Sequence, residues 1–309
     1  MRKFNLKGTV VQRMMGIPRE DPKTAPDENG VKTEETLTPA FSAEQGLIRC
    51  AWRTDVGRLR KNNQDAVILG NGLAAVADGM GGHRGGEIAS AGLRDGLLRE
   101  TKNSKPGTGS LTEAVKKVNL ELWQKQENDS SLSGMGTTLT VIWPAETEMI
   151  IGQIGDSRAY LLRGGELTQK TEDHSMVADM VRKGVLTEEQ AACHPMRNYI
   201  TRAVGTEEDV EIDVTTCRRQ KGDRWLVCSD GLHGMITQAQ LLEAMSTEDL
   251  EEAADKLLQA ALLSGGKDNI TLILLQDDTD IPEKTEENEE TGSDDAPAGG
   301  EKPEEVTEA

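Results

Sequence analysis

Residues 73–87 read LAAVADGMGGHRGGE. An apolar run of strand character ends at Asp78, a glycine-rich stretch follows, and a helix-forming segment begins near residue 86. A strand end is a rigid place from which to aim a carboxylate, and a neighbouring glycine lets a ligand approach the backbone closely. Asp-Gly also signals a tight hairpin turn. Because glycines and a helix follow Asp78 instead of a return strand, we interpret Asp78 as a site residue.

Three further aspartates occupy the same setting, beside an apolar strand and a glycine. They are Asp156 in IIGQIGDSRAY, Asp230 in RWLVCSDGLHG and Asp268 in SGGKDNITLILL. Carboxylates gathered in this way repel one another unless a cation lies among them. Their hard oxygens suit Mg²⁺ or Mn²⁺ better than zinc. The repeated setting therefore predicts a divalent-metal site built from strand ends.

Two other chemistries fit parts of this pattern. The loop GMGGHRGGE could cradle a nucleotide phosphate at a helix N-terminus. However, a G-x-G-x-x-G register that begins at Gly79 meets Arg84 in place of the third glycine, and the chain has no Gly-Lys-Ser/Thr for a P-loop. Cys228 lies two residues before Asp230, but it lacks a surrounding basic cluster that would lower its pKa. Packing at a strand end is the preferred interpretation of that thiol.

The charge of the chain is concentrated in its C-terminal part. The 309 residues include 35 Lys and Arg against 54 Asp and Glu, a formal net charge of -19. The stretch 277–309 holds about 14 acidic residues and roughly two lysines, so the remainder is only mildly acidic. This remainder gives no electrostatic reason to bind nucleic acid. The acidic stretch lacks the D-x-D-x-D-G pattern of a calcium loop, which argues against a cation-buffering protein.

Composition divides the chain into three parts. Both ends are poor in large apolar side chains and cannot offset the entropy of an ordered chain. We expect a flexible leader at 1–46, a single folded domain at 47–277 and a disordered acidic tail at 278–309. No apolar run reaches the length of a signal peptide or the ~18 residues of a membrane span. The four cysteines are scattered and indicate the reduced thiols of a cytoplasmic protein. A monomeric state is a separate expectation.

Short apolar segments separated by Gly or Asp turns favour antiparallel strand pairing. The predicted strands are 65–70, 73–78, 137–143, 149–155, 158–163, 209–215, 224–229 and 270–276. The longest predicted helices are 86–102, 111–128 and 248–263, and capping-box patterns begin at Ser110, Thr187 and Thr237. Many short strands with a few long helices predict an α+β fold of two packed sheets with helices outside them.

Ordered motifs run through nearly the whole predicted domain. They are TDVGRLRKNNQDA (54–66), VADGMGGHRGGE (76–87), GMGTTLT (134–140), IGDSRAYLLRGGEL (154–167), TEDHSMV (171–177), HPMRNYITRAVG (194–205), CSDGL (228–232) and GGKDNIT (265–271). Together they resemble the motifs of the metal-dependent protein phosphatase family, the type 2C phosphatases, in its bacterial branch. The resemblance implies a single domain with a central antiparallel β-sandwich flanked by helices on both outer faces. It also implies a two-metal centre at one end of the sandwich.

The resemblance assigns metal-binding roles to individual residues. Asp78 resembles the carboxylate that bridges both metals, and Gly79 resembles the residue that offers its carbonyl. Asp230 and Asp268 match the other metal ligands. Asp156 matches a position that binds a third, weaker metal in bacterial members.

Further positions of the first two motifs resemble substrate-binding and supporting residues. Arg60 lies where the family places an arginine that grips the substrate phosphate. Asp65 resembles an acidic position that contacts the metal centre directly or through water. The chain departs from animal members at Gln64, where they have a glutamate ligand, and at Met80, where they have a histidine proposed as general acid. Bacterial members share the second difference, which leaves the proton donor unassigned.

These roles imply a protein serine/threonine phosphatase that hydrolyses phosphoserine and phosphothreonine monoesters. Two Mn²⁺ or Mg²⁺ ions would lower the pKa of a shared water, and the bridging hydroxide would attack phosphorus in line. The metals and Arg60 would offset charge on the phosphoryl oxygens. Phosphorylated Ser/Thr proteins are the implied partners, among them a eukaryotic-like Ser/Thr kinase and its substrates. The alternative is a catalytically silent binding or regulatory module, although the full set Asp78, Asp230 and Asp268 argues against it.

The segment 173–202 resembles the flap that lies beside the active site in this family. It also fits an exposed helical hairpin, and the two interpretations are compatible. Flaps of this kind shape substrate choice. The chain's histidines lack paired metal-ligand spacing and are interpreted as structural, with only the first facing the site; they are His83, His174, His194 and His233.

Overall fold

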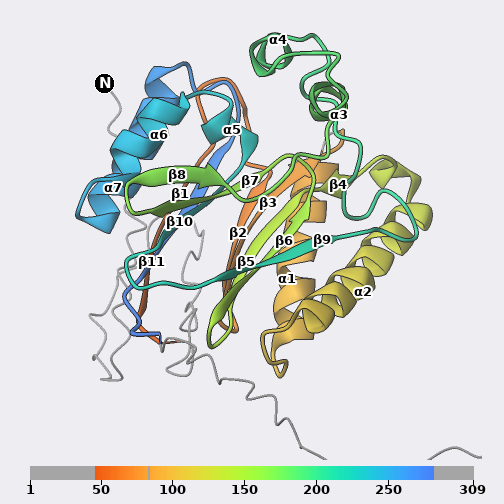
Figure 1. Cartoon of the computed structure of the whole chain (residues 1–309). Helices are drawn as coiled ribbons and strands as arrows, with labels where there is room; N and C mark the ends of the chain where they lie inside the picture. Colours follow the sequence, from red (N-terminus) through yellow and green to blue (C-terminus); the bar gives the residue numbers. More distant parts are fainter. Residues whose placement is uncertain (1–45, 83, 282–309) are drawn as a thin grey trace, which may run out of the picture.

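Two antiparallel β-sheets pack face to face, and helices cover both outer faces (Figure 1). The computed structural model describes residues 46–82 and 84–281, so most of the expected leader and tail lies outside it. The predicted α+β sandwich is confirmed. None of the helices in the described ranges combines the length and the apolar character of a membrane span.

The first sheet is five-stranded, in the order β1-β11-β10-β7-β8. Its strands are β1 (Ile48–Asp55), β7 (Arg158–Arg163), β8 (Glu166–Gln169), β10 (Arg224–Cys228) and β11 (Ile270–Asp277). The outer face is covered by α5 (Asp230–His233), α6 (Gln238–Met245) and α7 (Leu250–Leu263). The interior strand β11, between β1 and β10, is buried along its whole length, which explains why its sequence is almost continuously apolar.

The second sheet is six-stranded, in the order β2-β3-β5-β6-β9, with β4 paired to β3. Its strands are β2 (Asp65–Gly70), β3 (Leu73–Met80), β4 (Gly136–Thr137), β5 (Leu139–Pro144), β6 (Glu148–Ile154) and β9 (Asp213–Arg218). Helices α1 (Gly85–Thr101) and α2 (Thr108–Glu127) cover its outer face, followed by the short 3-10 helix η2 (Ser130–Leu132).

Strand β3 contributes to two cores because side chains alternate between the faces of a strand. Ala74 and Val76 pack between the sheets against residues of the first sheet such as Trp225. Ala75 and Ala77 face the helices α1 and α2. Burial of both faces therefore accounts for the uninterrupted small apolar run that precedes Asp78.

The predicted strand 137–143 is divided in the structure. The part called β4 pairs with the end of β3 at Gly79 and Met80, whereas β5 pairs further back along β3. Thr138 lies between the two parts and exchanges hydrogen bonds with the backbone of Asp78: its hydroxyl accepts from the Asp78 N–H at 2.9 Å. Its own N–H donates to the Asp78 carbonyl at 2.9 Å. The break in the ladder thus occurs at the site aspartate.

The predicted helix starts are partly confirmed. Thr187 and Thr237 form capping boxes at the N-termini of α4 and α6. The box predicted at Ser110 is wrong, because α2 begins at Thr108 with Gly107 as its N-cap. The hydroxyl of Ser110 instead donates to the carbonyl of Lys105 at 2.9 Å.

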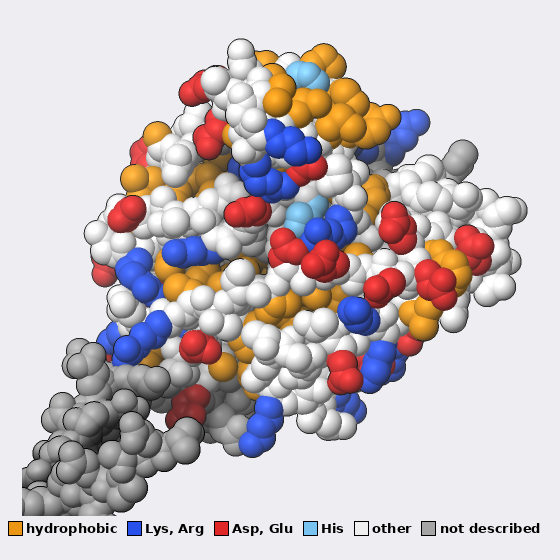
Figure 2. Space-filling model, turned by 45° about the vertical axis from the view of Figure 1, so that its right-hand side comes forward, with side chains coloured by type: hydrophobic (Ala, Val, Ile, Leu, Met, Phe, Trp, Pro, Cys, Tyr) orange, Lys and Arg blue, Asp and Glu red, His pale blue; other side chains and the backbone are white. Residues whose placement is uncertain are grey.

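The predicted flap is a projecting helical hairpin. It contains α3 (Met176–Arg182) and α4 (Glu188–Ala192), at the top of Figure 1. Its two arms are joined at the base, where the Met176 N–H donates to the Tyr199 carbonyl at 2.9 Å and the Thr201 N–H donates to the His174 carbonyl at 2.8 Å. Hydrophobic side chains gather at its outer end (Figure 2).

Candidate metal centre

Five aspartates from separate elements are brought together at one end of the sandwich. Asp65 begins β2, Asp78 lies near the end of β3, Asp156 precedes β7, Asp230 begins α5 with one residue between it and the end of β10, and Asp268 precedes β11. The pKa of Asp78 is raised well above its usual value, first by burial and then by the charges of the other four carboxylates. Each predicted carboxylate therefore lies within electrostatic reach of Asp78.

Asp65 and Asp78 are direct partners across the β2–β3 ladder. Burial raises the pKa of Asp65 to about 7, although hydrogen bonds from hydroxyl groups oppose this shift. One of these donors is Ser229, whose Oγ lies 2.8 Å from Asp65 Oδ2. The other carboxylate oxygen, Oδ1, is buried without a hydrogen-bond partner.

Asp230 lies in contact with the same pair. Burial and the charge of Asp268 raise its pKa to about 6, while a hydrogen bond with the Asp78 carboxyl lowers it. Asp230 Oδ1 is also buried without a partner. The next residue must be glycine, because a Cβ on Gly231 would lie 1.9 Å from the Asn269 carbonyl oxygen. Close packing of α5 against the start of β11 thus fixes Asp230.

The glycines near Asp78 allow two backbone segments, the end of β3 and the start of α1, to pack closely together. A Cβ on Gly79 would lie 2.1 Å from the carbonyl oxygen of Gly86, and a Cβ on Gly86 would lie 2.6 Å from the carbonyl oxygen of Gly79. The Gly79 N–H donates to the Gln64 carbonyl at 3.1 Å. The first turn of α1 is therefore pressed against the end of β3, where the backbone of Gly79 borders the aspartates.

Asp156 is buried at the edge of the cluster. Its pKa is raised to about 8 by burial and then by the charges of Asp230 and Asp173. His233 Nε2 lies 2.9 Å from the Asp156 carbonyl oxygen, and burial lowers the pKa of His233 to about 3. This neutral imidazole donates to the backbone of Asp156. Burial also raises the pKa of the Cys228 thiol to about 12, which favours the protonated thiol over a thiolate nucleophile.

Arg60 lies beside the cluster on the loop between β1 and β2. Its Nη2 is 2.6 Å from Asp268 Oδ2, and the side chains are 49% and 27% exposed. A half-exposed guanidinium can exchange this carboxylate for a phosphate group, because both offer oxygens in a geometry that matches its fork. The structure thus brings the predicted phosphate-binding residue to the predicted metal ligands. His83 lies outside the described residues.

Three polar residues that no sequence motif singles out position this cluster. Thr138 fixes the backbone of Asp78, Ser229 donates to Asp65, and the buried Asn269 hydrogen-bonds the loop that carries Arg60. Each of them lies inside a quoted motif: GMGTTLT, CSDGL and GGKDNIT. A polar residue at the end of a buried strand was the available signal.

The donor set fits small, hard divalent cations. In the described part of the chain, no group of three or more His, Cys, Asp or Glu side chains is arranged to hold a metal ion by itself. Mg²⁺ does not need such a cage, because it keeps several waters and takes one or two carboxylates. The buried oxygens of Asp65 and Asp230 that lack partners, together with the raised pKa values, are what a carboxylate cluster shows when its charge is not compensated.

The chain belongs to the protein phosphatase 2C family, whose sequence profile matches residues 58–264. It is 42% identical over 231 residues to the serine/threonine protein phosphatase PstP of Mycobacterium tuberculosis, covering 74% of this chain and 45% of that protein. It is 38% identical over 243 residues to the serine/threonine phosphatase stp of Listeria monocytogenes, covering 75% of this chain and 96% of that protein.

A solved structure shares the same fold. The catalytic domain of PstP in complex with two manganese ions superposes with a TM-score of 0.69 at 40% identity, covering 74% of this chain and 97% of that chain. This chain spans about half the length of the whole mycobacterial protein, since 45% of it is covered.

Proposed function

We propose that this protein is a serine/threonine phosphatase that hydrolyses phosphoserine and phosphothreonine monoesters at a two-metal Mn²⁺ or Mg²⁺ centre. The observation that carries the proposal is the cluster of five mutually repelling aspartates beside a half-exposed arginine. Such a cluster is costly to bury unless cations compensate it. The similarity to serine/threonine phosphatases and to a structure with two manganese ions supports the same conclusion.

The metal ligands proposed are Asp78 as the bridging carboxylate, the Gly79 carbonyl, Asp230 and Asp268. Asp156 is proposed for a weaker third metal. When bound, two such cations supply a water of lowered pKa and positive charge beside the phosphoryl oxygens. Asp65 borders Asp78 and holds the centre directly or through water.

The chain's own contribution to the reaction is binding, orientation and charge. Arg60 leaves Asp268 to hold two oxygens of the substrate phosphate, which orients the ester for in-line displacement. The hydrogen bonds of Thr138 with the backbone of Asp78 and the close packing of Gly231 keep Asp78 and Asp230 in place during this exchange. The buried thiol of Cys228 takes no part.

The proposed partners are phosphorylated Ser/Thr proteins, including a Ser/Thr kinase and its substrates. A monomeric state, a cytoplasmic location and the division into leader (1–46), domain (47–277) and tail (278–309) remain predictions. The first residues of the expected tail contact the domain: Asp278 pairs with Arg49 at 2.6 Å, and Thr279 Oγ1 accepts from Arg219 at 3.1 Å. A truncation that tests the division should therefore end after residue 281.

The experiment that tests the proposal is hydrolysis of a phosphothreonine peptide by the purified full chain. Turnover should require added Mn²⁺ or Mg²⁺ and stop in excess chelator, because oxygen ligands bind these cations reversibly. Undiminished turnover in chelator contradicts the two-metal centre. Absence of turnover with both metals favours the silent binding module, for which the described residues otherwise offer no support.

A further inference from the structure

Three exposed basic side chains flank Arg60 on the two segments that pack together beside it. Arg58, Lys61 and Lys267 are all exposed, and none of the three forms an ion pair with another residue in the ranges 46–82 and 84–281. By contrast, Arg60 between them is paired with Asp268. We call Arg58, Lys61 and Lys267 the basic rim.

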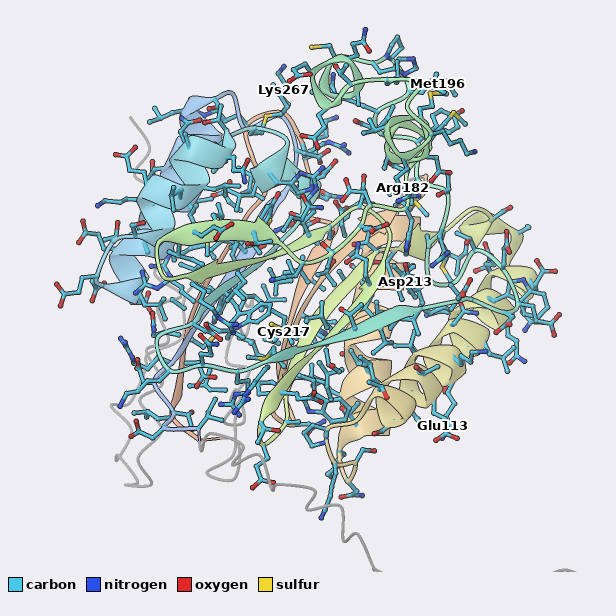
Figure 3. All side chains as sticks on the ribbon, viewed as in Figure 1. Glu113, Arg182, Met196, Asp213, Cys217 and Lys267 are labelled. Carbon is cyan, nitrogen blue, oxygen red and sulfur yellow. The ribbon has the colours of Figure 1, made fainter. Side chains whose placement is uncertain are left out.

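The two segments that carry the basic rim are in direct contact. The Arg58 N–H donates to the Gly266 carbonyl at 2.7 Å, and a Cβ on Gly57 would lie 2.1 Å from the Asp268 carbonyl oxygen. Lys267 follows Gly266 directly, and Figure 3 shows it at the end of the molecule that carries the flap. The backbone positions of these cations are therefore fixed relative to Arg60 and the aspartates.

The basic rim stands out against the charge of the whole protein. The chain has a formal net charge of -19, which gives no general attraction for an acidic ligand. Exposed charges act over about 8 Å at physiological ionic strength. The sign of the surface charge at the entrance to the site therefore decides which residues of a bound peptide are attracted there. The metal ions of the proposed centre would neutralise the negative charge of the aspartates that lie behind the basic rim. The positive charge of the basic rim would then remain available to a ligand.

We propose that the basic rim binds acidic side chains that flank the phosphorylated residue, so that the preferred substrates are phosphoserine or phosphothreonine segments rich in Asp and Glu. The side chain of Leu59, 70% exposed between Arg58 and Arg60, adds an apolar contact for the same segment. This inference rests on the proposed function and names the substrate class of that site.

The test compares three phosphothreonine peptides of one length, whose flanking residues are Glu, Ala or Lys. In the wild-type protein with Mn²⁺, kcat/KM should fall in the order Glu, Ala, Lys. An exposed charge pair contributes a factor of roughly two to five, so the ratio of the Glu peptide to the Lys peptide should be about tenfold. The ratio should shrink as salt is added, because salt screens exposed charges.

The double variant Lys61→Glu/Lys267→Glu should bring the Glu-to-Lys ratio to one or below. Its matched control is Lys102→Glu/Lys105→Glu, which makes the same change of charge at two exposed lysines in the α1–α2 connection. That connection lies at the opposite end from the flap (Figure 1), and the control should keep the wild-type ratio. The ratio cancels any effect common to all peptides, including an altered metal affinity.

Equal kcat/KM for the three peptides in the wild-type protein would overturn this inference, and so would an unchanged ratio in the double variant. Either result leaves the proposed function standing as long as the Ala peptide is hydrolysed in a metal-dependent manner. Failure of the wild-type protein to hydrolyse any of the peptides counts against the proposed function itself.

Discussion

The buried amide of Asn269 holds the loop that carries Arg60. Asn269 Nδ2 donates to the carbonyl oxygens of Val56 at 3.0 Å and of Asn62 at 2.9 Å. Its Oδ1 accepts from the Gln64 N–H at 2.8 Å. One side chain therefore ties the loop at points before and after Arg60, and it does so from the residue next to Asp268.

Asn269→Ala should lower kcat/KM for phosphopeptides by roughly 10-fold or more, because each lost hydrogen bond is worth about 1 kcal/mol and the freed loop no longer presents Arg60. The diagnostic measurement is a double-mutant cycle. Adding Asn269→Ala to Arg60→Ala should cause little further loss if Asn269 acts through Arg60. Asn62→Ala, which truncates an exposed amide on the same loop, is the control and should be close to wild type.

Independent losses that multiply in the double variant would show that Asn269 affects the site by another route. Thermal unfolding should be measured in parallel, since a buried carbonyl left unpaired costs about 1–3 kcal/mol of stability.

Asp78→Asn should abolish turnover while preserving the fold. The substitution keeps the side-chain volume but removes the charge that four other carboxylates repel, so the metal-free variant should melt above the wild type. Mn²⁺ affinity, measured by calorimetry, should fall together with kcat. Asp95→Asn, at an exposed position of α1, is the matched control. A variant that keeps more than about a tenth of the wild-type rate would lose less than ~1.4 kcal/mol of barrier stabilisation, and the ligand assignment would be wrong.

The metal-free protein should lose stability as pH rises from about 4 to about 8. The pKa values of Asp230, Asp65 and Asp156 are raised by burial to about 6, about 7 and about 8. A carboxyl whose pKa is raised on folding stabilises the native state while it is protonated, and this stabilisation is lost as pH rises through the folded pKa. Tm should fall over this range by several degrees, since about 1 kcal/mol shifts Tm by roughly 2–4 °C at this size.

Saturating Mn²⁺ should remove or reverse this pH dependence, because bound cations compensate the ionised carboxylates and bind better as protons leave. The measurement is calorimetric unfolding in chelator and in Mn²⁺ at several pH values. A Tm in chelator that rises between pH 5 and pH 8 would show that the carboxylates are compensated within the protein alone.

The sequence predicts the position of a strand well where an apolar run marks it, and poorly where pairing with a neighbouring strand sets its bounds. Strand β7 lies where its apolar run predicts it, and β11 differs by only one residue. The alternating segment 209–215 predicts a strand that the structure begins at Asp213. Val210 and Ile212 are buried, as their alternation indicates, and they pack in the core with residues of α1 and α2. They do not belong to the strand, because the pairing of β9 with β6 ends at Asp213 and Gln153.

Strand β1 and the supporting residues escape prediction for a related reason. Strand β1 carries Arg49 and Arg53, whose acidic partners lie on distant segments, so it shows little apolar periodicity. The contacts of Ser229 with Asp65 and of Asn269 with Gln64 join positions more than one hundred residues apart. The aspartates were predicted because their chemistry and local setting are visible in single motifs. The residues that position them are defined by neighbours that only the fold provides.

Arg60→Ala separates phosphate recognition from metal binding. Arg60 and Asp268 form a partly exposed pair, and such pairs contribute only about 0–1 kcal/mol. Loss of Arg60 should therefore change Mn²⁺ affinity, measured by titration, by less than about fivefold. A charge-assisted contact with the substrate phosphate is worth about 1.5–3 kcal/mol.

The expected loss in kcat/KM for an uncharged-flank phosphopeptide is thus roughly 10- to 150-fold. Arg60→Lys should recover part of it, because a lysine restores the charge but not the two-pronged geometry. Arg218→Ala, which removes an exposed guanidinium at the end of β9, is the matched control and should leave turnover unchanged. If Arg60→Ala kept wild-type kcat/KM while Mn²⁺ affinity fell, Arg60 would be a support for Asp268, and the phosphate would have to be held by a different cation.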